Sequence, residues 1–253
     1  MQINNSGVEL KWLGHSSFQI KTADNKIIYI DPYNISEGLA KADLILITHS
    51  HYDHCSIADI ERVVQDGTTI VVSADSQSKI TRLKVSVNIH IIEPDKEVSF
   101  GDVRISTLPA YNLDKSFHPK SEGWLGFLVR IGGVLIYHAG DTDLIPEMQK
   151  LTGFCGKCEE FIALLPVGGR FTMTAEEASE AAKLIKPTLA IPMHYGSVAG
   201  SEDDAKEFVS LCSEQGIKSE GLIIISLKIN WIKNLLRWVI FISLVSRKSY
   251  LFV

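Results

Sequence analysis

The stretch that decides the fold is DLILITHSHYDHCS, residues 43–56. It opens with a short apolar run at 43–49 that contains β-branched residues, which predicts a buried strand. Three imidazoles and one carboxylate follow this run in the spacing His-x-His-x-Asp-His: His49, His51, Asp53 and His54. Loops at the ends of strands are common places for functional side chains. The stretch therefore predicts an α/β fold with a site at the end of a buried strand.

The spacing of these four residues is typical of metal binding. On an extended loop, residues two positions apart point the same way, so His49 and His51 can hold one ion while Asp53 and His54 face a second. Burying each of these groups separately would carry a desolvation cost, but a divalent ion partners all of them. A chance surface cluster is the alternative, and the strand before the cluster argues against it.

Two further candidate ligands stand at the ends of apolar runs. Asp141 closes VLIYHAGD and His194 follows TLAIPM. A carboxylate has two oxygens and can bridge two cations about 3.5 to 4 Å apart, which one imidazole nitrogen cannot do. Taken singly, a Gly-Asp-Thr sequence can be an ordinary turn, and a histidine at a strand end can be a satisfied buried residue. Together with the first loop, they predict a two-metal site.

Strands and helices alternate along the remainder of the chain. Alternating or continuous apolar runs predict strands within 8–32, 69–74, 88–110, 124–138, 163–169 and 188–196. Helices are predicted at 56–66, 174–186 and 202–216, the second with a capping box formed by Thr174 and Glu177. Strands come first in each half and helices follow, so two βα layers packed face to face account for this order. We expect one domain over residues 1–220.

The composition of the chain favours certain partners and one cellular location. A net charge of -5 supplies no general attraction for nucleic acid, so we expect a small-molecule substrate. Four cysteines are too few for a disulfide framework, and the N-terminus lacks the pattern of a secretory signal. These features predict a cytoplasmic protein. They leave its oligomeric state open.

Residues 221–253 form an apolar and basic C-terminal extension of unknown role. Its longest uncharged stretch, WVIFISLV, is much shorter than the roughly 20 apolar residues of a spanning helix. An interfacial helix is one alternative. We favour a packed surface helix or a tail foreign to the fold, and we expect no membrane contact.

Five motifs occur in one order along the chain: WLGHSSF (12–18), the His-x-His-x-Asp-His loop, YHAGDTD (137–143), LPVGGRFTM (165–173) and IPMHYG (191–196). In this order they resemble the metallo-β-lactamase-fold hydrolases. The likeness covers about Val8 to Gly216. It is greatest to predicted metal-dependent hydrolases similar to ascorbate-6-phosphate lactonases, and more distant to the phospholipase D that acts on N-acylphosphatidylethanolamine.

This resemblance implies an αββα four-layer sandwich with two divalent ions, zinc or in some members manganese. It assigns the first ion to His49, His51 and one intermediate ligand. It assigns the second ion to the group Asp53, His54 and His194, with Asp141 bridging both. Many superfamily members have a histidine where this chain has Asn112. Either His118, six residues later, replaces it, or Asn112 binds weakly through its oxygen; we favour His118.

The expected activity is hydrolysis of a small ester, lactone or phosphodiester by a hydroxide that two metals activate, with Asp53 orienting the nucleophile and carrying a proton. The alternatives are a redox-active di-iron version of the site and a metal-binding sensor or partner module without catalysis. His15 and His138 are expected near the metals as residues that orient ligands. Three other side chains could contact an anionic substrate: Lys120, Arg170 and Tyr195.

Overall fold

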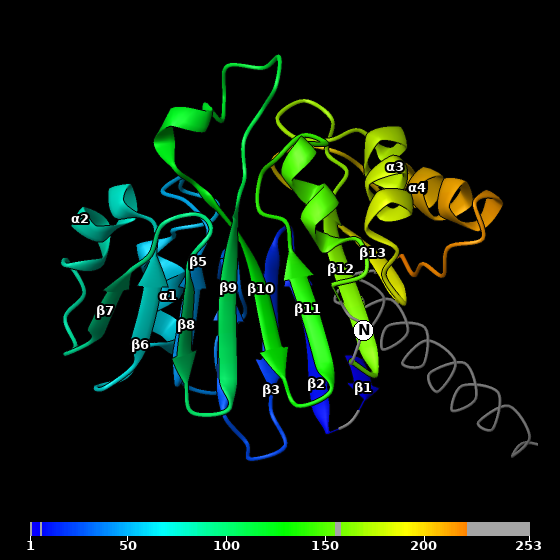
Figure 1. Ribbon diagram of the computed structural model, residues 1–253. Helices are drawn as coiled ribbons and strands as arrows, with labels where there is room; N and C mark the ends of the chain where they lie inside the picture. The colour runs from blue at the N-terminus through cyan, green and yellow to red at the C-terminus, as the bar shows by residue number, and fades with distance from the viewer. Residues whose placement is uncertain (1, 6, 155–157, 222–253) are drawn as a thin grey trace, which may run out of the picture. The chain divides into compact units, whose positions relative to one another are not determined.

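The computed structural model describes residues 2–5, 7–154 and 158–221. Within these ranges two mixed sheets pack face to face and helices flank them, which confirms the expected αββα sandwich (Figure 1). The extension predicted from residue 221 lies outside these ranges apart from Gly221, so its role stays a prediction. In the described ranges every helix is too short or too polar to span a lipid bilayer.

The first sheet carries the decisive stretch. Its strands follow chain order across the sheet: β1 (Gln2–Asn5), β2 (Val8–Gly14), β3 (Ser17–Lys21), β4 (Ile27–Ile30), β5 (Leu44–Ile47), β6 (Thr69–Val72) and β7 (Asn88–Ile91). Strands β1 to β4 are antiparallel, and β4 to β7 pair in parallel. All four residues of β5 are buried, because both faces of this central strand are covered.

The second sheet supplies the other half of the site. Its spatial order runs β13-β12-β11-β10-β9-β8, with these bounds: β8 (Glu97–Phe100), β9 (Val103–Pro109), β10 (Leu125–Ile131), β11 (Val134–His138), β12 (Glu160–Pro166) and β13 (Leu189–Met193). Strands β8 to β11 pair antiparallel, with the expected turn at Gly132 between β10 and β11. Strands β11, β12 and β13 are parallel.

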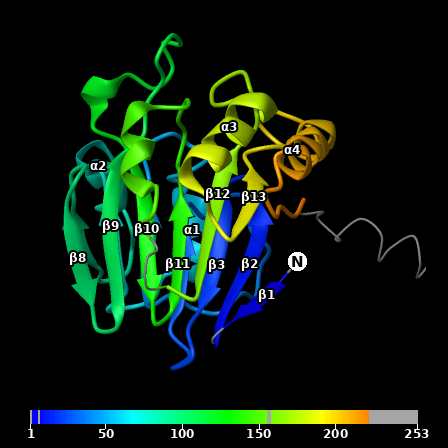
Figure 2. The same cartoon turned by 45° about the vertical axis from the view of Figure 1, so that its right-hand side comes forward.

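The helices cover the outer faces of the sheets. Their bounds are α1 (Ile57–Val63), α2 (Gln77–Ile80), α3 (Ala175–Ile185) and α4 (Glu202–Glu214), with short 3₁₀ turns at Ala74–Ser76, Lys120–Glu122 and Pro146–Leu151. The helices α3 and α4 lie together beside β12 and β13 (Figure 2). Thr174 and Glu177 form the predicted capping box of α3. The short β1 and α2 were not predicted from the sequence, since QINN and QSKI each contain a single apolar residue and show no period.

Two apolar clusters hold the layers together. The inner faces of both sheets share one cluster, which includes Phe18, Phe127 and Ile136. Ile47 from the first sheet and Ile60 from α1 belong to the other, on the outer side. Burial of such side chains is the main stabilising contribution to a fold of this size. The sandwich is therefore a rigid support for the loops at its edges.

One cysteine forms a disulfide, which the low number of cysteines did not predict. Cys55 and Cys212 are free and buried. Cys158 is disulfide-bonded, although the cysteine count gave no reason to expect a disulfide. The cytoplasmic location stays a prediction.

Candidate metal centre

Loops from both sheets meet at one edge of the sandwich and carry the predicted ligands. The segment after β5 supplies four of them, and the loop between β9 and β10, which rises highest in Figure 1, supplies His118. Asp141 follows β11 and His194 follows β13. The structure thus brings together all seven residues that we selected from the sequence. Their potential ligand atoms form two main groups, each within 4.8 Å: His49 with His51 and His118, and Asp53 with His54, His194 and His15. A third group, His49 with His54 and Asp141, links them.

The first group presents imidazole nitrogens only. Thr48 Oγ1 donates to Asp31 at 2.6 Å and lies 2.9 Å from His49 Nδ1. Because that hydroxyl proton is already used, His49 Nδ1 must be the donor, and its Nε2 keeps a free lone pair. This Nε2 lies 3.0 Å from His51 Nδ1. Two nitrogens that share one tetrahedral zinc ion would lie about 3.3 Å apart, so the pair is spaced to hold a metal.

The loop after β9 decides between the two candidates for the third position. Asn112 Oδ1 lies 3.0 Å from His118 Nδ1 and accepts a bond from the His118 backbone N–H. The Asn112 amide nitrogen donates to Asp143 and to the Phe171 carbonyl. With its side chain committed to these contacts, Asn112 orients His118 instead of taking its place. Since His118 Nδ1 faces two carbonyl-type oxygens, its Nε2 remains available as a ligand.

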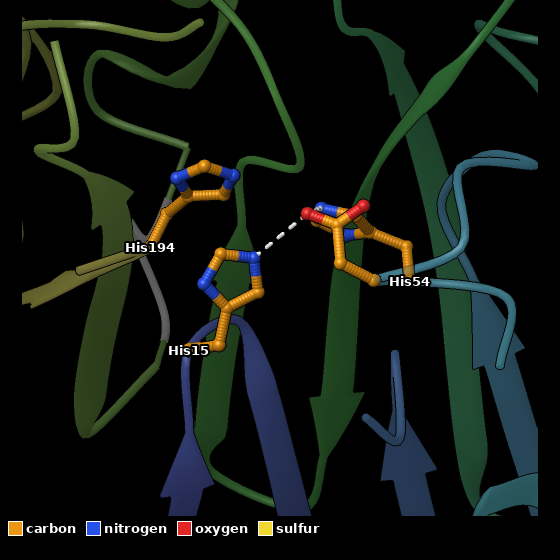
Figure 3. A group of neighbouring side chains, drawn as sticks. His15, His54 and His194 are labelled. Atoms are coloured by element: carbon orange, nitrogen blue, oxygen red, sulfur yellow. Dashed lines mark hydrogen bonds and ion pairs between the residues drawn. The ribbon is translucent and has the colours of Figure 1, made fainter. Parts of the chain in front are cut away.

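The second group combines imidazoles with a carboxylate. In Figure 3 the rings of His15, His54 and His194 turn toward a common region, and the dashed line joins His15 to a carboxylate. That contact is His15 Nε2 to Asp53 Oδ2 at 3.0 Å. His54 Nδ1 donates to Asp31 Oδ2 at 2.7 Å, which leaves His54 Nε2 pointing inward without a proton when the ring is neutral.

Asp141 lies between the two groups. Its Oδ2 is 3.2 Å from His118 Nε2 and 3.1 Å from His194 Nε2. Its Oδ1 is 3.3 Å from His54 Nε2. One carboxylate therefore reaches both sets of nitrogens, which is the placement that a bridging ligand requires.

Unpartnered buried atoms show that these residues fit divalent ions. His54 Nε2, His118 Nε2, His194 Nε2 and Asp141 Oδ1 are all buried without a hydrogen-bond partner. The distances to Asp141 are short, but the angles do not make hydrogen bonds there. Each such atom costs about 1–3 kcal/mol when it is left unsatisfied. A cation between them would satisfy all four, and three imidazoles with carboxylates are the donor set of zinc.

Burial and charge set the pKa values before any cation binds. Burial lowers the pKa of His49 well below its ordinary value, and the charge of His54 adds to this. Burial also lowers the pKa of His51. For His54 the carboxylates of Asp141 and Asp31 outweigh the effect of burial and raise the pKa well above the ordinary value. His49 and His51 are therefore ready for a metal at neutral pH, whereas His54 carries a proton that a metal must displace.

Asp53 is ionised at neutral pH. Burial alone would raise its pKa, but the hydrogen bond from His15 and the charge of His54 lower the pKa of Asp53 to about 2. Burial lowers the pKa of His15 to about 4 despite the contact with Asp53. His15 is thus neutral near pH 7 and donates Nε2–H to an ionised Asp53.

The backbone around the site is locally strained. His15, Asp31 and His194 have φ values of 51°, 45° and 59°, which side chains other than glycine rarely adopt. A Cβ at Gly168 would lie 2.6 Å from the His194 carbonyl oxygen and 2.9 Å from His194 Nδ1. Only glycine fits there, so Gly168 in the LPVGG motif leaves the space that His194 occupies.

Two residues that contact the candidate ligands, Asp31 and Trp124, were not predicted from the sequence. Asp31 holds both Thr48 and His54, and its place directly after the buried β4 could have revealed it. Trp124 lies against the rings of His49 and His51, each with a centroid distance of 4.8 Å, and its Nε1 donates to Asp75. No local pattern marks Trp124, because the contact joins segments distant in sequence.

The expected supporting histidines behave differently from each other. His15 contacts Asp53, as predicted. His138 instead joins the two sheets, since its Nε2 donates to the Ser16 carbonyl at 2.8 Å. Its Nδ1 accepts from the Gly140 backbone N–H. Both nitrogens of His138 contact backbone groups and no candidate ligand side chain, so its expected role in orienting ligands stays a prediction.

Comparison with known proteins agrees with this geometry. Residues 9–194 match the family described as the β-lactamase superfamily domain. The chain belongs to the metallo-β-lactamase superfamily. A UPF0173 metal-dependent hydrolase from Thermococcus onnurineus is 33% identical over 229 residues, covering 86% of this chain and 96% of the relative. Membership of this family of metal-dependent hydrolases confirms the enzyme class predicted from the motifs.

Solved structures of the superfamily share the architecture. A metal-dependent hydrolase from Parabacteroides distasonis has 29% identity and a TM-score of 0.73, covering 87% of this chain and 96% of that one. A diiron β-hydroxylase from Streptomyces venezuelae has 15% identity and a TM-score of 0.68, covering 87% of this chain and 53% of that one, and shows the fold alone. The names of these relatives give no substrate, so the likeness to ascorbate-6-phosphate lactonases stays a prediction.

Proposed function

We propose that this superfamily member hydrolyses a small ester, lactone or phosphodiester with two divalent ions held by the two ligand groups. The observation that carries the proposal is the set of unpartnered buried nitrogens of His54, His118 and His194 around the Asp141 carboxylate. A protein that bound no cation would gain nothing from this arrangement. Zinc suits the imidazole-rich donors best, with manganese as the alternative.

When bound, the two ions supply a water with a pKa of about 7 and polarise the scissile carbonyl or phosphoryl oxygen. The chain itself supplies orientation and proton transfer. Asp53 is ionised at neutral pH, so its carboxylate can accept a proton from the nucleophile and deliver it to the leaving oxygen. The hydrogen bond from His15 fixes Asp53 in position, which makes His15 a positioning residue.

Metal content and turnover of purified protein test this proposal together. We expect about two equivalents of zinc or manganese, and metal-dependent turnover within a panel of methyl esters, γ-lactones and bis(p-nitrophenyl) phosphate. Asp141→Ala removes the contact common to both groups, so it should lose both ions and all turnover. Asp203→Ala is a matched control, because the Asp203 side chain is 87% exposed on α4.

Three outcomes would contradict the proposal. Full activity of metal-depleted Asp141→Ala would exclude metal catalysis. Iron with redox activity would favour the di-iron alternative. Two bound ions without turnover of any substrate in the panel would favour a sensor or partner module.

A further inference from the structure

A pocket of about 200 Å³ adjoins the candidate ligands. One side is formed by site residues: His51, Asp53, His118, Asp141 and His194. The other side is formed by Tyr52, Phe117, Phe171 and Val198. Pockets for drug-sized ligands measure roughly 300–1,000 Å³. This one therefore admits only a small group beside the reacting atoms.

The wall opposite the ligands is apolar and partly open to solvent. Phe117 and Phe171 meet edge to face with ring centroids 4.7 Å apart. Phe117 is 43% exposed and Tyr52 is 63% exposed. Single exposed apolar residues are common, but large aromatic side chains gathered around one small pocket indicate a surface that an apolar ligand covers.

Positive charge is absent from the wall. Among the described residues that line the pocket, none is a lysine or an arginine. Neighbouring cations have other partners: Lys115 binds Asp143 at 2.6 Å and Lys120 binds Glu147 at 2.7 Å. Arg170 stacks on the Phe171 ring at 5.0 Å and does not line the pocket.

Two of the side chains expected to contact an anion have other partners in the structure. Lys120 is paired with Glu147, and Tyr195 is buried and stacks on Trp12 at 5.0 Å. On the apolar side of the pocket, away from the ions that the ligand groups would hold, an anionic substituent would lose water and gain no cation from the wall. An apolar substituent would lose no favourable hydration and would gain free energy by burying its surface.

We propose that the pocket holds a short, uncharged apolar substituent of the substrate, so that the enzyme prefers small neutral carboxylic esters and lactones to those whose acyl group is charged. The proposal rests on the proposed function. In the reaction the water oxygen bonds to the acyl carbon, and the bond from that carbon to the leaving oxygen breaks. One proton from water ends on the leaving alcohol, and the other is released as the product acid ionises.

Methyl esters test the proposal well, because the methanol leaving group is too small to fill the pocket. With zinc-loaded enzyme, acid release from methyl acetate, methyl butanoate and monomethyl succinate gives three kcat/KM values. Each buried methylene should raise kcat/KM about fourfold, so methyl butanoate, which has two methylenes more, should exceed methyl acetate roughly fifteenfold. The kcat/KM for monomethyl succinate should be at least about tenfold below that for methyl butanoate, because its free carboxylate is charged.

Variants locate the effect in the wall. Phe171→Ala should remove most of the preference for methyl butanoate and leave methyl acetate nearly unchanged. Val198→Lys places a cation at the half-buried Val198 and should raise kcat/KM for monomethyl succinate. It provides a gain of function if Phe171→Ala folds poorly. Lys206→Ala, at an exposed position of α4, is the control and should leave all three kcat/KM values within about twofold. Arg170→Ala tests whether Arg170 recognises the charged ester.

The outcomes separate the two proposals. Ester turnover without a preference for methyl butanoate, or with a preference for monomethyl succinate that Arg170→Ala abolishes, would overturn the apolar pocket and leave the hydrolase proposal standing. Turnover of the phosphodiester alone would do the same. Metal-loaded protein that cleaves nothing in the full panel would overturn both.

Discussion

The two ligand groups sit side by side at one edge of the sandwich but use different chemistry to prepare for a cation. The imidazoles of His49 and His118 are oriented by uncharged groups, the Thr48 hydroxyl and the Asn112 amide. The other group is oriented by carboxylates: Asp31 holds His54, and Asp53 is itself a member.

The two groups therefore differ in the protonation of their imidazoles and in the negative charge that attracts a cation. In the first group the pKa values of His49 and His51 are lowered, so a metal meets no proton on these two rings. The first group has no carboxylate of its own and depends on Asp141 for charge balance. The second group has stronger attraction for a cation, and the raised pKa of His54 means that a proton competes for the position. A two-metal site of this kind should bind its ions with unequal affinity and unequal pH dependence.

The largest effect should come from disabling one group at a time. His51→Ala and Asp53→Ala should each retain about one ion of two, and each should lose turnover by roughly 10³-fold, because both ions act on the reacting atoms. Elemental analysis and kcat/KM measure the two effects. If either variant kept both ions and full activity, the division into two groups would be wrong.

The pH dependence of metal binding sharpens the comparison. Because the pKa of His54 is raised, this ring is protonated at neutral pH before metal binding, and lowering the pH strengthens the competing proton. Zinc affinity of the second group should therefore fall up to about tenfold per pH unit between pH 8 and 6. The first group should change less over the same range, because the pKa values of His49 and His51 are lowered.

Single-group variants allow each side to be measured. Zinc affinity of His51→Ala reports the second group, and that of Asp53→Ala reports the first. Chelator competition at several pH values gives the two slopes, and calorimetry in buffers of different ionisation enthalpy counts released protons. Equal slopes for the two variants would show that His54 does not hold a competing proton.

A smaller effect should follow from Asn112→Ala. Loss of the amide removes the acceptor that fixes the His118 ring, and such losses typically weaken metal binding 10–100-fold. The weakening should affect the first group alone, so the ion held by the second group is the internal control. Unchanged affinity at both positions would mean that the Phe171 carbonyl suffices to orient His118.

Much of this arrangement could be predicted from local pattern. The buried run at β5, the alternating strands and the capping box at Thr174 are encoded within a few residues of each other, and each has a period or spacing that physical chemistry explains. The convergence of Asp141 and His194 on the first loop was predicted from their positions at strand ends. Parallel strands present their carboxyl ends at the same edge of a sheet, which explains why Asp141 after β11 and His194 after β13 lie together. The loop after β5 belongs to the other sheet, so its approach to them depends on how the two sheets pack.

By itself, the sequence determined which residue types would meet and at which edge, since hydrophobic period and strand order are local properties. Only the tertiary structure decided that Asn112 orients His118 instead of replacing it, that His138 joins the sheets, and that Asp31 supports His54. These choices depend on hydrogen-bond partners brought together from distant segments. The packing of the two sheets sets the distances and angles between these hydrogen-bonding groups, and the spacing of residues along the chain does not predict them.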